Sequence, residues 1–413
     1  MIRNKNIIVG LDIGSTKICC VVAETGGDEP EIIGLGTHTS RGLRKGVVVN
    51  IDATVEAIKR AVEEAELMAG VEVDSVYVGM AGAHISGFNS HGVIAARGSE
   101  VTRQDMEKVL EAARAVNIPM DREIIHVLPQ EYIVDGQDGI VDPEGINGVR
   151  LEAKVHIITA SATSVRNIIR SVNRAGLEVE GLVVEQLAAS EATLDKDEKE
   201  LGVTLINMGG GTCDIAVYLN GALRNTAVVP LGGAHITNDV AVGLRTPNHE
   251  AEKIKRHSGC ATAAMVSNDE IMEVPGVGGR EPRRLSRKVL ADIIEPRLTE
   301  IYTMIREELE LSGFAQRKKI ASGLVLTGGA AIMQGAPELA EAIFDMPVRM
   351  GTPRGIKGLV DLVNGPMYAT AVGLVIHGHR MERSGQSRGY SRSGAFNKAL
   401  EKVKCWAAEF IGS

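Results

Sequence analysis

The chain has 413 residues, of which 44% are hydrophobic and 24% are charged. This composition is typical of an ordinary globular protein and excludes wholesale disorder, while the length exceeds what one hydrophobic core usually organises, so we expect two or more subdomains. The formal net charge of −8 argues against a protein that coats nucleic acid. Charge is unevenly spread, because residues 378–413 carry a net +4 and the rest of the chain −12, which indicates an anionic partner for the tail alone.

The five cysteines form no CxxC pair and no cluster with histidine, and no signal-peptide pattern occupies the first ten residues. An odd number of cysteines in a long chain of this kind is typical of the reducing cytosol. Two uncharged stretches, 320–337 and 362–379, approach the length of a membrane span. Gly, Pro and polar residues interrupt both, so we expect buried strand, turn and helix there.

The first strong feature along the chain is a strand, a glycine-rich turn and a second strand at residues 7–22. Its turn exposes backbone N–H groups and hydroxyls with few bulky side chains, which makes a cradle for phosphate oxygens. Asp12 supplies a carboxylate that can hold a hydrated Mg²⁺. The phosphate candidates in this turn are Gly14, Ser15, Thr16 and Lys17.

Helix and strand patterns follow this hairpin. Residues 52–68 have the periodicity of an amphipathic helix, and 73–80 read as a strand. The next segment combines a helical pattern at 102–116 with strand-like runs at 123–134 and 150–159. We therefore expect a compact α+β insertion in this part of the chain.

The hairpin recurs at residues 203–218, where Asn207 lies 195 positions after Asp12. A hairpin repeated across half a chain predicts two related halves that face each other. Either turn alone is better explained as an ordinary tight hairpin, but two copies in register favour phosphate binding. The candidates in the second turn are Gly209, Gly210, Gly211 and Thr212.

Residues 234–244 and 250–256 predict two helices after the second hairpin. Glu252 and Lys255 lie three residues apart on one helical face, where they can bracket ribose hydroxyls. A solvated surface pair explains the same spacing at least as well.

Residues 282–312 predict a long helix, or a helix pair interrupted at Pro296. A buried strand is then expected at 321–327, and it runs into a glycine pair. There the backbone can approach a flat base or a sugar, and the following helix can face phosphate. The candidates at this position are Gly328, Gly329 and Ala330.

The composition of the C-terminal region changes to Arg, Ser and Gly, which predicts a flexible linker over 379–393. Residues 394–413 then predict a helix whose apolar side chains fall within an arc of about 140°, with lysines on the other face. Such a helix suits the plane of an anionic membrane surface. Docking on the protein's own core is the alternative, against which the polar linker argues. The membrane-facing candidates are Phe396, Leu400, Val403, Trp406, Phe410 and Ile411.

The two hairpins together with Thr327-Gly328-Gly329 resemble the phosphate-1, phosphate-2 and adenosine motifs of the actin/Hsp70/sugar-kinase superfamily, in the same order. The resemblance implies a bilobed actin-like α/β fold with a duplicated, ribonuclease H-like ATPase core and with ATP and Mg²⁺ in the cleft between its halves. It assigns both turns to phosphate, residues 328–330 to adenosine, and Glu252 and Lys255 to ribose. It also places Glu185 near the metal or the attacking water.

Within this superfamily the chain resembles the FtsA family of bacterial cell-division proteins over essentially its whole length. The resemblance is carried by Gly79-Met80-Ala81-Gly82, by the segment 126–132, by Pro230-Leu231-Gly232-Gly233 and by the terminal amphipathic helix. The organisation that it implies is subdomain 1A at 1–83 and 160–200, inserted subdomain 1C at 84–159, subdomain 2A at 201–245 and 319–378, subdomain 2B at 246–318, the linker at 379–393 and the membrane-targeting helix at 394–413.

The family resemblance also implies partners. It indicates a peripheral protein at the cytoplasmic face of the inner membrane that polymerises and anchors filaments of the tubulin-like protein FtsZ at the division site. The inserted subdomain would serve self-association and contacts with later division proteins. A locally basic region in the second half would take the acidic C-terminal peptide of FtsZ, although charge runs are usually solvated helix faces. Its candidates are Arg284, Arg287, Lys288 and Arg297.

One position departs from the superfamily pattern, because Asn207 stands where an aspartate is usual. A neutral amide lacks the negative charge that helps to hold Mg²⁺ or to orient water, so we expect ATP binding with slow or no turnover. Two other readings stay open: an actin-like pilus-assembly protein, which would not need the terminal helix, and a sugar-kinase-type phosphotransferase, which would need a catalytic base and a substrate pocket.

Overall fold

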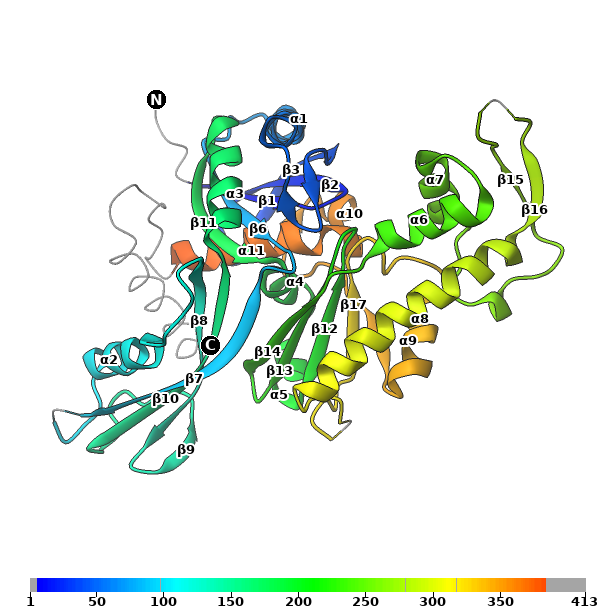
Figure 1. The fold of residues 1–413 in the computed structure, drawn as a ribbon. Coiled ribbons are helices and arrows are strands. Elements are labelled where there is room, and N and C mark those ends of the chain that lie inside the picture. The colour runs from blue at the N-terminus through cyan, green and yellow to red at the C-terminus, as the bar shows by residue number, and fades with distance from the viewer. Residues whose placement is uncertain (1–5, 97, 279, 317, 384–413) are drawn as a thin grey trace.

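The computed structural model describes residues 6–96, 98–278, 280–316 and 318–383. The expected membrane-targeting helix, with its candidates from Phe396 to Ile411, lies outside the described residues. Within them, two lobes built on separate β-sheets face each other, and a smaller unit extends from the first lobe (Figure 1).

The first lobe contains a six-stranded sheet in the order β11-β6-β1-β2-β3-β19. The first three strands form an antiparallel meander, and β6 and β11 add to it in parallel. The bounds are β1 Ile7–Ile13, β2 Lys17–Glu24, β3 Glu31–Thr39, β6 Ser75–Met80, β11 Glu178–Val184 and β19 Lys357–Gly358.

The second lobe repeats this topology in a five-stranded sheet ordered β14-β13-β12-β17-β18. Again three antiparallel strands precede two parallel ones, so the duplication predicted from the hairpins is confirmed. All six residues of β12 are buried, as expected for a strand that is covered on both faces. The bounds are β12 Val203–Met208, β13 Cys213–Leu219, β14 Ala222–Val229, β17 Leu324–Thr327 and β18 Val348–Met350.

Helices cover both sheets. In α1, Asn50 caps the first turn by accepting a hydrogen bond from the Ala53 N–H, and Gly70 ends the helix in the left-handed region with φ of 68°. The buried face of α1 is the apolar stripe that the sequence predicts. The bounds are α1 Ile51–Ala69, α3 Ala162–Arg174, α4 Glu185–Thr193, α5 Lys196–Leu201, α6 Gly233–Leu244, α7 Asn248–Ser258, α8 Arg287–Leu311, α9 Ala336–Phe344, α10 Val360–Val363 and α11 Ala369–Arg383.

The inserted unit is an antiparallel sheet in the order β7-β10-β8-β9 with α2 packed on it, and it has its own apolar core. The α+β insertion expected from the sequence is therefore present. Its position beside β14 gives it contact with the second lobe as well as the first. The bounds are β7 Ser86–Ala95, α2 Arg103–Arg114, β8 Arg122–Val134, β9 Gln137–Ile140 and β10 Arg150–Ser161.

The region 282–312 differs from its expected form at its start, and the structure decides between the two forms expected around Pro296. Its first residues belong to a two-stranded sheet of β15, Ile271–Val274, and β16, Arg283–Ser286. The helix α8 then runs unbroken through Pro296. The single long helix is therefore confirmed, and the alternative of a helix pair interrupted at Pro296 is wrong. Proline removes one backbone hydrogen bond, but the buried stripe on either side of it holds the helix against the second lobe.

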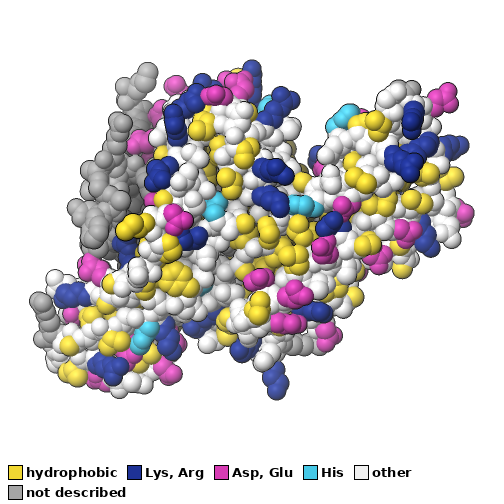
Figure 2. Space-filling view, viewed as in Figure 1, with side chains coloured by type: hydrophobic (Ala, Val, Ile, Leu, Met, Phe, Trp, Pro, Cys, Tyr) yellow, Lys and Arg dark blue, Asp and Glu magenta, His cyan; other side chains and the backbone are white. Residues whose placement is uncertain are grey.

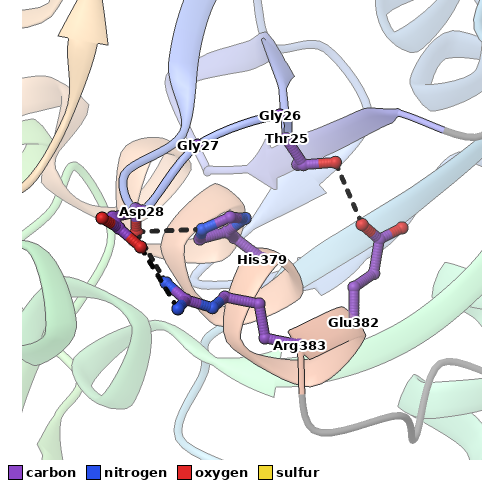
Figure 3. Close-up of a pocket in the computed structure, with 7 residues that line it drawn as sticks. All are labelled: Thr25, Gly26, Gly27, Asp28, His379, Glu382 and Arg383. Atoms are coloured by element: carbon purple, nitrogen blue, oxygen red, sulfur yellow. Dashed lines mark hydrogen bonds and ion pairs between the residues drawn. The ribbon is translucent and has the colours of Figure 1, made fainter.

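The end of α11 also corrects the sequence prediction. The linker was expected to begin at residue 379, yet α11 continues to Arg383. Figure 3 shows how a shallow pocket at this end is held together: Thr25 donates to Glu382 at 3.1 Å, and His379 and Arg383 each bind the carbonyl oxygen of Asp28 at 3.1 Å. These long-range bonds order residues that composition alone assigns to a linker.

Within the ranges that the structure describes, none of the helices combines the length and the hydropathy that crossing a bilayer requires. The two apolar stretches noted in the sequence contribute to strand β17 and to the helices α10 and α11 instead. This is the strand, turn and helix arrangement that their Gly, Pro and polar residues predict.

Candidate functional site

The two glycine-rich turns, one from each lobe, lie against each other. Each is a tight hairpin turn, closed by a bond from the Gly14 N–H to the Lys17 carbonyl at 3.1 Å and by its counterpart from Gly209 to Thr212 at 2.9 Å. A Cβ added to Gly210 would lie 2.3 Å from Thr16 Cγ2. The absence of side chains in the second turn is therefore required by the approach of the first.

The expected adenosine segment lies beside the second turn. The Ala330 N–H donates to the carbonyl of Met208 at 3.0 Å, and Gly328 has a φ of 87° that favours glycine. The α6 helix starts at the same place, where the Gly233 N–H donates to the Gly209 carbonyl at 3.0 Å. The structure thus brings together three motifs that are far apart in the sequence.

Three buried carboxyl groups form the floor between the turns. Burial raises the pKa of Asp12 to about 6 and that of Asp214 to about 7. The pKa of Glu185 lies well above its ordinary value because of burial and of the negative charges of Asp12 and Asp214. Asp12 shares a hydrogen bond with Glu185, and Asn207 donates a hydrogen bond to Glu185. One oxygen of each of the three carboxyl groups is buried without a hydrogen-bond partner.

Asp214 is a member of this group that is not among the candidates predicted from the sequence. It accepts a hydrogen bond from the Thr212 hydroxyl at 3.2 Å and is fully buried. The signal that could have identified it is a carboxylate in an otherwise apolar strand, since a charged side chain is rarely buried without a specific reason.

The side chain of Lys17 reaches the segment that precedes α11. Its ammonium donates to the Met367 carbonyl at 2.9 Å and lies 4.2 Å from the centre of the Tyr368 ring. In the same segment, the Pro366 carbonyl accepts a hydrogen bond from the Gly328 N–H at 3.1 Å. Lys17 thereby ties the first turn to the adenosine segment in this structure.

Glu252 and Lys255 are not a solvated pair. They form an ion pair of 2.7 Å in which the Lys255 side chain is only 10% exposed. Lys255 also donates to the Gly233 carbonyl at 2.9 Å and to the Thr237 hydroxyl at 2.8 Å, so both residues adjoin the start of α6. The sequence-predicted ribose residues are thus brought to the phosphate and adenosine motifs.

The candidate basic residues of the second lobe lie on β16 and α8, along the outer part of that lobe (Figure 1). Arg287 and Arg297 have internal partners, Glu270 at 2.6 Å and Asp239 at 2.5 Å. Arg284 is exposed and Lys288 is half-buried. Figure 2 shows several Lys and Arg side chains gathered at the outer end of the second lobe, at the upper right of the view.

One contact to the first turn was missed by sequence reasoning. The short strands β4, Leu43–Arg44, and β5, Val47–Val48, form a hairpin in the first lobe. The Gly46 N–H in its turn donates to Oγ of Ser15 at 2.9 Å. Two-residue strands carry too little periodicity for a pattern to show them, although a glycine in a short turn is a general signal for a hairpin.

The duplicated sheets and the facing turns define an actin-like α/β protein. Solved structures agree on the fold: the PilM–PilN type IV pilus biogenesis complex is 18% identical with a TM-score of 0.64 over 90% of this chain and 98% of that one. MreB5 of Spiroplasma citri is 14% identical with a TM-score of 0.55 over 93% of this chain and 99% of the other.

The sequence comparisons are more specific. The family model for cell division protein FtsA matches residues 204–373, and that for the SHS2 domain inserted in FtsA matches 82–159. The cell division protein FtsA of Pseudomonas aeruginosa is 49% identical over 98% of both chains, and that of Escherichia coli is 41% identical, also over 98% of both. The chain belongs to the FtsA family of cell-division proteins, and the resemblance noted in its motifs is confirmed.

Proposed function

We propose that this actin-like cell-division protein binds ATP in the cleft and uses it to control assembly. The observation that carries the proposal is the contact between the two glycine-rich turns beside the adenosine segment. Stacked turns of this kind offer backbone N–H groups to a chain of phosphates. MreB5 of Spiroplasma citri, which shares the fold, has been solved with ADP and with AMPPNP.

The floor of the cleft fits a hydrated Mg²⁺. Asp12, Glu185 and Asp214 each keep a buried oxygen without a partner, and carboxylate oxygens suit this hard cation. Among the described residues no group of three acidic, histidine or cysteine side chains is arranged as a direct metal site. Asp12 would therefore hold the ion through water, and the ion would neutralise the phosphates and the buried carboxyl groups. Isothermal titration with ATP, with and without Mg²⁺, tests this step.

Turnover of the bound ATP is expected to be slow. The Asn207 amide is neutral and contributes no negative charge. It also donates a hydrogen bond to Glu185, the carboxyl group that could otherwise orient a water. We assign ATP a role in assembly, with hydrolysis as a minor activity.

The chain would anchor FtsZ filaments to the membrane. The amphipathic pattern at 394–413 supports a membrane-targeting helix. One such helix binds the membrane weakly, and several helices on a polymer bind it firmly by avidity. Identity of 49% to an FtsA over 98% of both chains favours this role over pilus assembly, for which the similarity is 18%. A phosphotransferase role has no comparable support.

The test is sedimentation with anionic liposomes, with and without ATP, for the full chain and for a chain that ends at Ser393. Tail-dependent binding that ATP strengthens and that recruits FtsZ would support the proposal. Binding to liposomes that does not need the tail would indicate that residues 394–413 dock on the protein itself and do not bind the membrane. Absence of recruitment by a membrane-bound chain would contradict the anchoring role.

The acidic C-terminal peptide of FtsZ would bind at β16 and the start of α8. Of the four basic candidates, Arg284 is exposed and available, whereas reversal of Arg287 would also break its pair with Glu270. Arg284→Glu should weaken peptide binding several-fold, and Arg170→Glu, an equal charge change on exposed α3, should not. Equal affinities of the two variants would place the peptide elsewhere.

The inserted unit would serve self-association and contacts with later division proteins. Its separate core and its projection from the first lobe make it a distinct surface (Figure 1). Deletion of residues 84–159 followed by electron microscopy of ATP-containing samples on lipid would test the first of these roles. Filaments that form normally without the insert would contradict it.

A further inference from the structure

The hairpin of β4 and β5 places a lysine at the junction of the two glycine-rich turns. Its two turn residues, Lys45 and Gly46, have φ of 51° and 76°, as in the two-residue turn that suits hairpin twist. Asparagine or glycine is usual at the first of these positions, and a lysine there is uncommon.

The backbone of this turn is in contact with both lobes. On the first lobe, a Cβ added to Gly46 would lie 2.4 Å from the carbonyl oxygen of Ala81, and the Gly46 N–H holds Ser15. On the second lobe, a Cβ added to Gly211 would lie 2.9 Å from Lys45 Cα and 2.7 Å from Ser15 Oγ. Lys45 thus stands where the two candidate phosphate turns meet.

The ammonium of Lys45 is available to a ligand. The side chain is exposed, and in the part of the chain that the structure describes no hydrogen bond or ion pair holds it. Its charge reaches the first turn of α6, where burial and Lys45 together lower the pKa of His235. An unpaired cation at this junction is suited to an anionic ligand.

The two ends of the second turn have different neighbours, and this sets the direction of a nucleotide. The Gly209 end is bonded to Gly233, at which a Cβ would lie 3.1 Å from Cβ of Ala330 in the adenosine segment. The Gly211 end adjoins Lys45. A nucleotide whose adenosine lies at Ala330 and whose phosphates follow the turn reaches Lys45 with its last phosphate.

We propose that Lys45 binds the terminal phosphate of the nucleotide and so distinguishes a nucleoside triphosphate from a diphosphate. This inference rests on the proposed binding of ATP in the cleft. Since the Lys45–Gly46 turn touches both lobes, its contact with the third phosphate would also favour the closed arrangement of the cleft. Loss of that phosphate would remove the contact and leave the remaining ones in place.

The test is titration of the full chain and its variants with Mg·ATP and Mg·ADP. Lys45→Asn removes the charge and keeps a residue that suits the turn, Lys45→Arg keeps the charge, and Arg44→Asn removes the neighbouring exposed charge of the same hairpin. Lys45→Asn should weaken ATP about tenfold, the loss of one charged hydrogen bond, and ADP less than about twofold. Lys45→Arg should keep most of the preference, and Arg44→Asn should leave it unchanged.

An equal loss for ATP and ADP in Lys45→Asn would overturn the proposal, because it would show a general charge effect. No change in either affinity would also overturn it. A wild-type chain that binds neither nucleotide would contradict the proposed function itself, which is a separate outcome. Thermal unfolding without nucleotide shows whether Lys45→Asn is folded, and its melting temperature should match that of the wild type within a few degrees.

Discussion

Nε2 of His156 in the inserted unit lies 2.9 Å from Oγ1 of Thr226 on β14 of the second lobe. The other ring nitrogen lies 2.7 Å from Oδ1 of Asn89, and nearby Gln130 donates to the Leu223 carbonyl at 2.8 Å. His156 is fully buried in this contact. A polar joint therefore fixes the inserted unit to the edge strand of the lobe that carries the second glycine-rich turn.

The first prediction concerns acid stability. Burial lowers the pKa of His156 to about 4, below that of an unfolded histidine, so the unfolded chain binds the proton first as pH falls. The titration of His156 therefore lowers the free energy of unfolding as the pH falls from about 6.5 to 4. Between pH 7 and pH 5, His156→Gln should reduce the loss in unfolding free energy by about 2 kcal/mol.

Chemical denaturation of the variant at the two pH values measures this effect. His257→Gln changes an exposed histidine of α7 and should leave the acid sensitivity of the chain as it is. If His156→Gln and the wild type lose the same stability on acidification, the buried joint is not the group that titrates.

The second prediction has the opposite sign. Burial raises the pKa of Asp214 to about 7, so the folded chain holds a proton that the unfolded chain has released, and stability falls as pH rises from about 4 to 7. Asp214→Asn keeps the shape and the bond from Thr212 but cannot ionise. Without nucleotide, it should reduce the loss of unfolding free energy between pH 5 and pH 8 by on the order of 2 kcal/mol.

The same denaturation series checks this result, with Asp292→Asn on the exposed face of α8 as the control. Parallel pH curves for Asp214→Asn and the wild type would show that Asp214 is ionised throughout. A Mg·ATP titration of the variant should also show weaker binding, since a neutral amide cannot contribute negative charge at the cleft floor.

The third prediction concerns Asn207. Replacement by aspartate would remove the amide that donates to Glu185 and add a fourth acidic group beside Asp12 and Asp214. At pH 8 without nucleotide, Asn207→Asp should lower the unfolding free energy by about 1–3 kcal/mol, the cost of leaving a buried polar group without its partner. Mg·ATP should restore more stability to the variant than to the wild type, because the cation neutralises the added charge.

Differential scanning fluorimetry with and without Mg·ATP and a phosphate-release assay test this prediction together. The variant should hydrolyse ATP faster than the wild type if the missing carboxylate limits turnover. Asn268→Asp makes the same change of an amide to a carboxylate at an exposed loop position and is the control. Robust hydrolysis by the wild type that Asn207→Asp does not raise would contradict the role given to this position.

Local patterns were sufficient for the two glycine-rich hairpins, for the duplication and for the helix α1, predicted over 52–68 and observed over Ile51–Ala69. They failed at β7, which is not recognisable from its sequence because many of its residues are exposed. Its glycines are explained only by distant partners: a Cβ on Gly87 would lie 2.2 Å from Oγ1 of Thr226, and one on Gly92 2.3 Å from the Val109 carbonyl.

The site shows the same division. The turns, the glycine pair and Asp12 follow from short motifs, because a phosphate cradle is a local backbone structure. The neighbours of Lys17 and Lys45 do not, because Met367, in the segment before α11, and Gly211, in the second lobe, are brought to them by packing between distant parts of the chain. The resemblance to a family supplied the order of the motifs, whereas these contacts depend on three-dimensional packing.

The last prediction tests the contact between the two turns. Gly210 has no left-handed backbone conformation, so alanine fits its backbone, but the added methyl would overlap Thr16, 2.3 Å away. The turns must then separate or shift, at a typical cost of 1–3 kcal/mol for overpacking. Gly210→Ala should weaken ATP and ADP alike, by about tenfold, because both nucleotides place phosphates against these turns. Gly98→Ala, whose new methyl would meet nothing closer than 3.8 Å, should bind both as the wild type does. Unchanged nucleotide affinity in a folded Gly210→Ala variant would show that the phosphates bypass this contact.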